Sequence, residues 1–514
     1  MEVSNGATLN VLGSLLAVGT SQDPVELTKP QSAVYGGGIR IIGGGLTTLE
    51  TAARFPIRLV ESGPAGGAIL ARETARQAGL RRVLSFDMGG TTAKLCLVDD
   101  FEPLSSRSFE VDRVYRFKKG SGLPVRIPVI EMVEIGAGGG SIAQVDKLRR
   151  IQVGPESAGS EPGPACYGRG GERPAVTDAD VCLGRVVADT FAGGAFRLDT
   201  AAAQHALQSG VAEPLGLDLR TAAFGVSEVV DENMAAAARA HAAEFGLDLA
   251  SRDMVAFGGA APLHAVRLGE KLGVRRIVIP AEAGVGSAVG FLLAPVAYEV
   301  VRSRRQALSE LDAGVVNGLM AEMRAEALAV VGQGMRQGLG PSAAGDRLVE
   351  TRQAYMRYRG QGHEIPVALP AEEYGEAHRV RFREAFEAAY RQLYGRVIDN
   401  VEIEALSWTL TLAAAGIGAE EVGGGGPDCG SGPCPRSESR EPASAIASQP
   451  LFDPATGAFA DAPVYLRTEL AVGARVPGPA LITEDQTTTV VAAAWEAAID
   501  AHGSIVLSRR EAAA

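Results

Sequence analysis

Residues 81–98 read Arg-Arg-Val-Leu-Ser-Phe-Asp-Met-Gly-Gly-Thr-Thr-Ala-Lys-Leu-Cys-Leu-Val. The first apolar run ends in the carboxylate of Asp87. The turn that follows contains Gly89, Gly90, Thr91 and Thr92, and a second apolar run occupies Leu95–Val98. Two apolar runs separated by a short glycine turn predict a strand, a tight turn and a second strand.

This turn has the composition of a phosphate-binding loop. Glycines let the backbone bring its N–H groups close to a bound anion. The two threonines add hydroxyl donors, Lys94 adds a cation, and Asp87 is placed to hold a hydrated magnesium ion. An ordinary β-hairpin with a glycine turn explains the same residues. This stretch alone does not decide between the two interpretations.

Two common nucleotide-binding patterns are missing from the sequence. No Gly-Lys-Ser/Thr opens a helix after the turn, which excludes a Walker loop. Residues 136–140 read Gly-Ala-Gly-Gly-Gly, but Ser141 stands where a dinucleotide fingerprint needs its last glycine. This second stretch, with Gly138 and Gly139, is either another cradle for an anion or a flexible turn.

The composition limits the classes of function. The 514 residues are 46% hydrophobic and 21% charged, with a formal net charge of −12. These values are typical of a folded protein of about two to four domains. The acidic balance, without a Lys/Arg cluster, argues against nucleic-acid or anionic-membrane partners.

Cysteine usage and apolar runs predict where the protein resides. Five cysteines, an odd number, fit a reducing compartment better than a disulfide framework. The apolar segment Leu9–Gly19 lacks the basic residues of a secretory signal, and the later run Ser287–Tyr298 is too short to cross a bilayer. A cytoplasmic protein is therefore expected.

Strands and helices alternate in two stretches, which predicts an α/β domain. The expected elements are strands at Ile39–Ile42, 82–98 (the hairpin), Met254–Phe257 and Arg276–Ile279, and helices at Ala68–Gly79 and Leu263–Lys271. Further along, a helix is expected at about Ala307–Gln337, strands at 351–369, a helix at 371–394 and a strand at 401–413.

Changes in composition divide the chain into five parts. They are an atypical segment at 1–36, a core at 37–305, an α+β region at 306–415, a flexible linker or loop at 416–449 and a small β-rich part at 450–514.

A second glycine turn lies between a predicted strand and a predicted helix, in Phe257-Gly258-Gly259-Ala260-Ala261-Pro262-Leu263-His264. Such a turn lets an adenine ring lie against bare backbone next to a helix N-terminus. A plain strand-to-helix turn is the alternative. His264, in the first helical turn, is more often a helix-end histidine than a proton-transfer catalyst.

Other polar residues admit a structural role. Asp178 and Asp180 either bind a cation or start a helix, and capping is favoured for Asp178. Cys166 is favoured as a structural thiol over a nucleophile, because no histidine partner is evident. Cys429 and Cys434 are close together in sequence, but no second pair completes a zinc site.

Seven motifs occur in a fixed order along the first 264 residues and together carry a resemblance. They are Glu-Ser-Gly-Pro-Ala-Gly-Gly (61–67), Phe-Asp-Met-Gly-Gly-Thr-Thr (86–92), Ile-Gly-Ala-Gly-Gly-Gly-Ser-Ile-Ala (135–143), Val-Gly-Pro-Glu-Ser-Ala-Gly (153–159), Pro-Gly-Pro-Ala-Cys-Tyr-Gly-Arg-Gly-Gly (162–171), Val-Thr-Asp-Ala-Asp (176–180) and Phe-Gly-Gly-Ala-Ala-Pro-Leu-His (257–264). The sequence closely resembles the hydantoinase A / 5-oxoprolinase family, which includes N-methylhydantoinase and acetone carboxylase beta subunits. The resemblance covers about residues 38–303 and continues through Arg-Tyr-Arg-Gly-Gln-Gly-His and Gly-Pro-Ala-Leu-Ile-Thr-Glu.

The resemblance implies an α/β fold with an actin/Hsp70/hexokinase-like (ribonuclease H-like) ATPase core, followed by a C-terminal α+β region. It implies that Asp87 is catalytic and binds Mg²⁺ together with ATP, in the second of two phosphate loops. Gly258 and Gly259 would form the adenosine-side turn. The full set of residues expected to bind ATP is Gly89, Gly90, Thr91, Thr92, Lys94, Gly138, Gly139, Gly258 and Gly259.

The family's chemistry is implied in the same way. Its members use ATP to phosphorylate the oxygen of a cyclic amide, or of an enolate in the carboxylases, with charge stabilised by Mg²⁺ and backbone donors. A hydantoinase B-type subunit usually supplies part of the site. The expected substrate is therefore a small cyclic amide or ketone.

The sequence departs from the family pattern in two places. The common loop reads Gly-Gly-Thr-Ser-Thr-Asp, whereas here it ends Thr-Thr-Ala-Lys. Actin's loop also carries a lysine at this distance from its aspartate, so the resemblance implies phosphate contact by Lys94. Residues 1–35 do not resemble the family's N-terminal domain, which carries its own Asp-x-Gly-Gly-Thr loop; that domain is expected to be lost or encoded separately.

The resemblance leaves three candidate functions: a subunit of a cyclic-amide hydrolase, a beta-type subunit of a ketone carboxylase, or a truncated non-catalytic subunit.

Overall fold

The computed structural model describes residues 38–40, 46–55, 62–106, 109–111, 114, 120–125, 127, 129–336, 348–414 and 444–510. Contacts group these residues into two compact units. Unit 1 falls within Met1–Ser62 and Phe291–Gly424, and unit 2 falls within Gly63–Gly290 and Gly425–Ala514.

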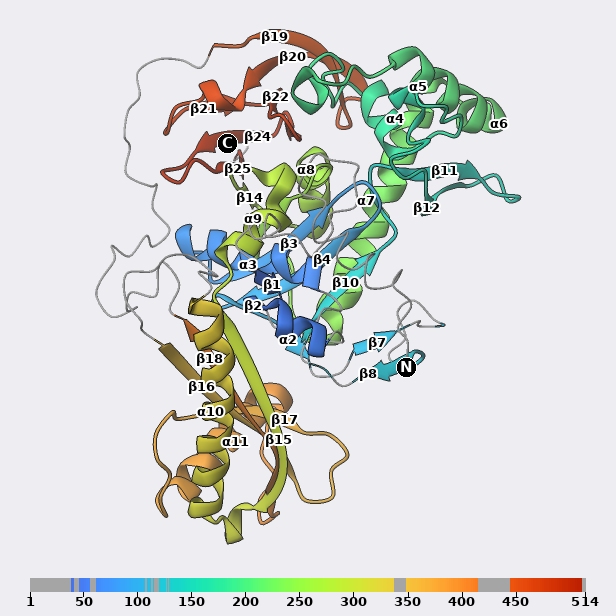
Figure 1. Cartoon of the computed structure of the whole chain (residues 1–514). Coiled ribbons are helices and arrows are strands. Elements are labelled where there is room, and N and C mark those ends of the chain that lie inside the picture. Colours follow the sequence, from blue (N-terminus) through green and yellow to red (C-terminus); the bar gives the residue numbers. More distant parts are fainter. Residues whose placement is uncertain are drawn as a thin grey trace. The chain divides into compact units, whose positions relative to one another are not determined.

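A nine-stranded sheet forms the centre of unit 2 (Figure 1). Its order is β10 (Met132–Ile135), β4 (Ala93–Asp99), β3 (Arg82–Met88), β13 (Asp253–Phe257), β14 (Arg276–Ile279), β25 (Ile505–Arg509), β24 (Trp495–Ile499) and β21 (Arg475–Pro477), with β5 (Glu102–Pro103) beside β4. β13 runs parallel to both β3 and β14, and β3 pairs antiparallel with β4. The predicted hairpin and the predicted strands at 254–257 and 276–279 are all present.

Helices complete the core of unit 2. They are α3 (Ser62–Gln77), α4 (Val176–Cys182), α5 (Thr200–Leu207), α6 (Glu213–Leu215), α7 (Leu219–Glu244), α8 (Ala261–Leu272) and the first part of α9 (Gly286–Leu293), whose residues from Phe291 on fall within unit 1. A π-helical turn at Gln208–Ala212 joins α5 to α6. α7 begins where the Asp218 carboxylate accepts the N–H of Thr221 at 2.9 Å. α8 has Pro262 in its first turn and ends at Gly273, whose φ of 77° suits glycine.

Shorter strands flank this core. β11 (Ser141–Val145) pairs with β12 (Ile151–Ser157), β6 (Ser105–Ser106) with β9 (Val129–Ile130), and β7 (Phe109–Val111) with β8 (Leu123–Val125). A separate four-stranded sheet has the order β19 (Ala447–Asp453), β20 (Ala458–Leu466), β22 (Ala480–Thr483) and β23 (Thr488–Val491).

The division of the chain differs from the one expected from composition. Residues 450–514 do not form a part of their own, because β25 pairs with β14 along four residues and extends the central sheet. The buried positions of β24 alternate through Trp495, Ala497 and Ile499, which is the pattern of a strand with one face in a core. Of the predicted linker at 416–449, residues 416–443 lie outside the described residues, and 447–449 begin β19.

Unit 1 is an antiparallel α+β structure. Its sheet has the order β15 (Ala297–Ala307), β18 (Ile403–Ala414), β16 (Leu348–Tyr358) and β17 (Ile365–Leu369), with α10 (Ala313–Arg336) and α11 (His378–Tyr394) packed on it (Figure 1). The short elements β1 (Gly38–Arg40), β2 (Leu46–Thr48) and α2 (Leu49–Arg54) belong to the same unit. In neither unit does the described chain contain a helix that is both long and apolar enough to cross a membrane.

Two predicted helices in unit 1 begin later than expected. α10 starts at Ala313 rather than near Ala307, because the residues up to Ala307 continue β15 along β18. α11 starts at His378 rather than at 371. Both helices have a buried face, with Met320 and Met323 in α10 and Phe382 and Phe386 in α11, and the Phe382 ring lies 6.4 Å from the Trp408 ring, centroid to centroid.

Candidate functional site

The β3–β4 hairpin places Asp87 and Lys94 opposite each other as cross-strand partners. The Lys94 ammonium donates to Thr92 Oγ1 at 3.0 Å and lies 3.5 Å from a carboxylate oxygen of Glu134 on β10. The N–H of Gly89 donates to the carbonyl of Thr92 at 3.1 Å. These contacts hold both ends of the turn Gly89–Thr92 in place.

The middle of this turn is open. A Cβ added at Gly89 or Gly90 would meet no heavy atom within 4 Å, and neither residue has a positive φ. Within the described chain, the N–H groups of Gly90 and Thr91 have no hydrogen-bond acceptor. The packing of the chain therefore does not require glycine here, whereas close approach of an anion to the backbone does.

The second glycine stretch, Gly138–Gly140, packs against this turn and hydrogen-bonds to its carbonyl groups. The N–H of Gly139 donates to the carbonyl of Gly89 at 3.0 Å, and the N–H of Gly140 donates to that of Gly90 at 2.6 Å. A Cβ on Gly138 would lie 2.6 Å from the carbonyl carbon of Gly90. Because the N–H groups of Gly138 and Gly139 already donate to protein acceptors, their visible role is support. Their direct contact with ATP stays a prediction.

The glycine turn after β13 lies beside the hairpin turn. β13 is parallel to β3, and its last residue, Phe257, pairs with Asp87. Gly258 has a φ of 100°, and a Cβ on it would lie 2.7 Å from Asp87 Oδ1. The N–H of Ala260 donates to the carbonyl of Met88 at 2.9 Å. Both turns thus leave the carboxyl ends of adjacent parallel strands, the usual place for ligands in such sheets.

The Asp87 carboxylate is held by residues far away in sequence. Ser287 Oγ, in the first turn of α9, donates to Asp87 Oδ2 at 2.8 Å. Gly67, in α3, packs so closely that a Cβ there would lie 3.2 Å from the same oxygen. Burial raises the pKa of Asp87, and the Lys94 charge and the Ser287 hydroxyl oppose that rise. Sequence reasoning missed Ser287; its one local signal is the small-residue run Ala283–Ser287.

The donors at this site fit a nucleotide-bound magnesium ion better than a dedicated metal centre. Mg²⁺ held with phosphates commonly takes only one or two protein carboxylates and keeps several waters. Asp87 provides one such carboxylate. The residues that the structure describes contain no group of three or more His, Cys, Asp or Glu side chains suited to a metal.

His264 lies in a fully buried charged cluster rather than at an open surface. Its Nδ1 is 2.8 Å from Asp231 Oδ1, and its Nε2 is 3.2 Å from Asp180 Oδ2. Arg185 donates to Asp180 at 3.0 Å and to Ser227 at 2.7 Å. Burial opposes protonation of the ring, but the two carboxylates outweigh it and raise the pKa of His264 to about 9. The histidine is therefore an imidazolium that neutralises buried carboxylates.

Asp178 and Cys166 take the structural roles that were favoured. Asp178 accepts the N–H of Ala175 at 2.8 Å, which caps α4, and also the N–H of Cys166 at 2.8 Å. Cys166 is fully buried, and burial together with the Asp178 charge raises the pKa of its thiol well above the usual range. Cys429 and Cys434 lie outside the described residues.

Comparison with known proteins identifies similar sequences along most of the chain. Residues 42–300 match the family model described as hydantoinase/oxoprolinase, and residues 343–509 match the model of its C-terminal domain. An uncharacterised protein of Methanocaldococcus jannaschii is 31% identical over 469 residues, which cover 91% of this chain and 64% of that protein. The caprolactamase subunit alpha of Pseudomonas jessenii is 29% identical over 465 residues, covering 89% of this chain and 62% of that subunit.

A solved structure shows the same fold. Nucleotide-free acetone carboxylase, described for its ATP-dependent carboxylation of acetone, has a TM-score of 0.70 and 25% identity, covering 92% of this chain and 64% of that chain. This likeness and the mixed α/β architecture confirm the expected fold class. The chain spans less than two thirds of the length of each of these relatives.

Proposed function

The chain belongs to the hydantoinase/oxoprolinase family, and from this premise we propose that it is the nucleotide-binding subunit of an ATP-dependent enzyme that opens cyclic amides. One observation carries the proposal. The turn Gly89–Thr92 has two N–H groups without an acceptor in the described chain, and it lies beside a carboxylate and a lysine at the carboxyl edge of parallel strands.

Each group at this edge has a role in handling the nucleotide. The N–H groups of Gly90 and Thr91 bind phosphate oxygens, and the Lys94 ammonium offsets their charge. Asp87 holds Mg²⁺ through its carboxylate, while Ser287 keeps one carboxylate oxygen in a fixed position. When bound, ATP supplies the phosphoryl group that turns the inert ring carbonyl oxygen into a leaving group.

Partners complete the site in this proposal. The described residues provide one phosphate turn, and the opposing phosphate loop comes from another domain or chain. A hydantoinase B-type subunit supplies part of the lactam-binding surface. The subunit designation of the caprolactamase relative supports such an assembly.

The test uses the full chain co-expressed with a hydantoinase B-type subunit. ADP release is measured with 5-oxoproline, hydantoin or caprolactam as the ring substrate. We expect at least one of these lactams to stimulate ADP release, and Asp87→Asn to abolish it. Retained turnover in Asp87→Asn would show that the phosphate turn is assigned wrongly.

Asp253→Asn is the matched control. Asp253 is the first residue of β13, at the opposite end of that strand from Phe257, which pairs with Asp87. It forms an ion pair with Arg276 near the surface at 2.9 Å. Such a pair contributes little to stability. We therefore expect this variant to retain wild-type turnover.

A beta-type subunit of a ketone carboxylase is the second candidate, and the likeness to acetone carboxylase favours it. The same preparation is assayed with acetone and bicarbonate in place of the lactam. ADP release with acetone, and none with any lactam, would replace the hydrolase assignment. A complex that binds no ATP would leave a non-catalytic subunit as the remaining interpretation.

A further inference from the structure

The turn between β22 and β23 packs against the glycine turn of the nucleotide site. Its four residues, Glu484–Thr487, are closed by a bond from the Glu484 N–H to the Thr487 carbonyl at 2.9 Å. Thr487 Oγ1 donates to the carbonyl of Gly259 at 3.0 Å, across 228 positions of sequence. A Cβ on Gly284 would collide with the Cβ of Gln486. This turn from the last part of the chain is therefore fixed beside Gly258 and Gly259.

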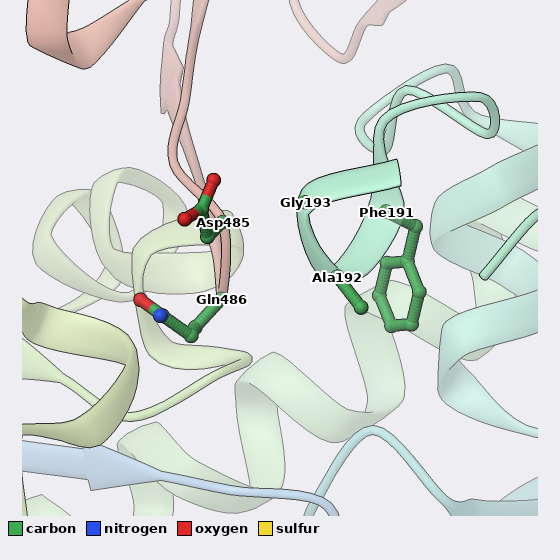
Figure 2. A pocket seen from close by; sticks show the side chains of 5 residues that line it. All are labelled: Phe191, Ala192, Gly193, Asp485 and Gln486. Carbon is green, nitrogen blue, oxygen red and sulfur yellow. The ribbon is translucent and has the colours of Figure 1, made fainter. Parts of the chain in front are cut away.

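The same turn forms one side of a hollow of about 550 Å³. Phe191, Ala192 and Gly193 of the 3₁₀ turn Phe191–Gly194 form the other side. Figure 2 shows Phe191 and Asp485 on opposite sides of the hollow, with the side chain of Gln486 extending away from Phe191. A volume of this size is within the range of small-molecule sites.

The aromatic side of the hollow is fixed by its own packing. The Phe191 ring lies 5.9 Å from the Tyr167 ring and 6.2 Å from the Phe196 ring, centroid to centroid. These contacts hold Phe191 in one position while part of it stays exposed. An immobilised aromatic surface suits the face of a flat heterocycle.

The opposite side is acidic. Glu282 and Asp485 are close enough to Glu484 to raise the pKa of that carboxyl group, in addition to the larger effect of burial. Carboxylates repel phosphate oxygens but accept hydrogen bonds from hydroxyl groups. Lys94 and the open amides lie instead at the Asp87 turn. The charge distribution thus places phosphates at Asp87 and a neutral, hydroxyl-bearing group at Asp485.

We propose that this hollow binds the nucleoside half of the nucleotide, with Asp485 accepting the ribose hydroxyls and Phe191 packing against the base. The proposal rests on the proposed function, because it assumes that the phosphates bind at Gly89–Thr92. It assigns to the turn after β22 the selection of a ribonucleoside triphosphate over a bare polyphosphate or a sugar that lacks hydroxyls.

The experiment measures dissociation constants for the full chain, assembled with its B-type partner. The ligands are ATP, 2′,3′-dideoxy-ATP and inorganic tripolyphosphate, each with Mg²⁺. Wild type is expected to bind ATP more tightly than dideoxy-ATP by about tenfold, the effect of a hydrogen bond to a charged group. Asp485→Asn should remove most of that preference.

Phe191→Leu tests the other side of the hollow with a side chain that preserves most of the buried volume. This substitution should lower the affinity for ATP by about tenfold and leave the affinity for tripolyphosphate unchanged. Asp461→Asn is the matched control, since Asp461 is an exposed residue of β20 and does not line the hollow. It should bind all three ligands as wild type does.

The outcomes separate the two proposals. ATP binding that neither Asp485→Asn nor Phe191→Leu alters would overturn the nucleoside site alone. The same holds for equal weakening of ATP and tripolyphosphate, because the effect would then act through the phosphate turn. Wild type that binds neither ATP nor tripolyphosphate would overturn the proposed function, and this inference with it. Thermal unfolding of each variant confirms that it is folded.

Discussion

Glycines at the proposed nucleotide site serve two different physical purposes. At Gly138 and Gly258 the structure has no room for a Cβ, because backbone or carboxylate atoms occupy that space. At Gly89 and Gly90 the space is open. The first kind is required by the fold. The second kind is not required by packing, and the proposed function explains it by a phosphate that approaches the turn.

Alanine substitutions distinguish these two kinds. Gly138→Ala should destabilise the protein by about 1–3 kcal/mol, because the new methyl group contacts the backbone of Gly90 and Thr91. Gly90→Ala should leave the melting temperature unchanged and weaken ATP about tenfold or more, since it obstructs charge-assisted hydrogen bonds to the phosphates. Thermal unfolding and calorimetric titration with ATP measure both effects. A Gly90→Ala variant that binds ATP normally would contradict the phosphate assignment.

The buried cluster around His264 predicts a large effect on stability. His264→Ala leaves Asp180 and Asp231 buried, and among the described residues Arg185, which pairs with Asp180, is then the one cation shown in contact with either carboxylate. The expected loss is about 3–5 kcal/mol in the free energy of unfolding at pH 7. His205→Ala, on the exposed surface of α5, is the control and should change little.

The same cluster gives a pH dependence with a definite sign. The pKa of His264 is raised from 6.5 to about 9 in the folded protein. Its contribution to stability is therefore complete below pH 6.5 and is lost as the pH rises through 9. Urea unfolding between pH 8 and 10, above the range in which Glu484 titrates, should show this decline in wild type and not in His264→Ala. A parallel decline in both would mean that another group is responsible.

The β22–β23 turn holds a carboxyl group that destabilises the fold at alkaline pH. Burial, together with Glu282 and Asp485, raises the pKa of Glu484 from 4.5 to about 7, while Arg467 opposes the rise. The stability this group provides is complete below pH 4.5 and is lost as the pH rises through 7. Glu484→Gln should therefore stabilise the protein by about 2 kcal/mol at pH 8 and have little effect at pH 5.

Denaturant unfolding of Glu484→Gln at the two pH values measures this difference. Glu469→Gln is the control, because Glu469 is exposed at the end of a nearby 3₁₀ turn. An equal gain at pH 5 and pH 8 would show that the charge of Glu484 is not the cause.

At the scale of elements, helices and strands could be predicted from neighbouring residues in the sequence. Contacts between residues far apart in the sequence could not. The hairpin at 82–98 was predictable because two apolar runs and a glycine turn are adjacent in sequence. α10 was predicted six residues too early, because its apolar spacing overlaps the end of a strand that is specified by its pairing with β18. The partners of Asp87 and His264 were not predictable, since Ser287 lies 200 positions and Asp180 lies 84 positions away.

At the scale of the whole molecule, the motifs predicted the fold class, but the composition did not predict which segments share a sheet. The resemblance of seven motifs predicted the α/β ATPase class, because each motif is short and specific. Composition, however, separated 450–514 from the core. β25 belongs to the central sheet because it pairs with β14, a strand that lies far away in the sequence. The composition of residues 450–514 does not show that β25 pairs with β14.

The two tryptophans of the chain test this division into units. Trp495, on β24 of unit 2, and Trp408, on β18 of unit 1, are both fully buried and both donate an indole N–H, to Glu270 and to the Arg304 carbonyl respectively. Alanine at either position should destabilise its unit by about 3–5 kcal/mol.

Because β24 and β25 continue the central sheet, Trp495→Ala should lower amide-exchange protection in β3 and β13 as well as in 444–510. Trp408→Ala should instead lower it mainly in β15, β16 and β18. Hydrogen-exchange mass spectrometry measures both patterns, and a loss confined to 444–510 in Trp495→Ala would support a separate C-terminal part.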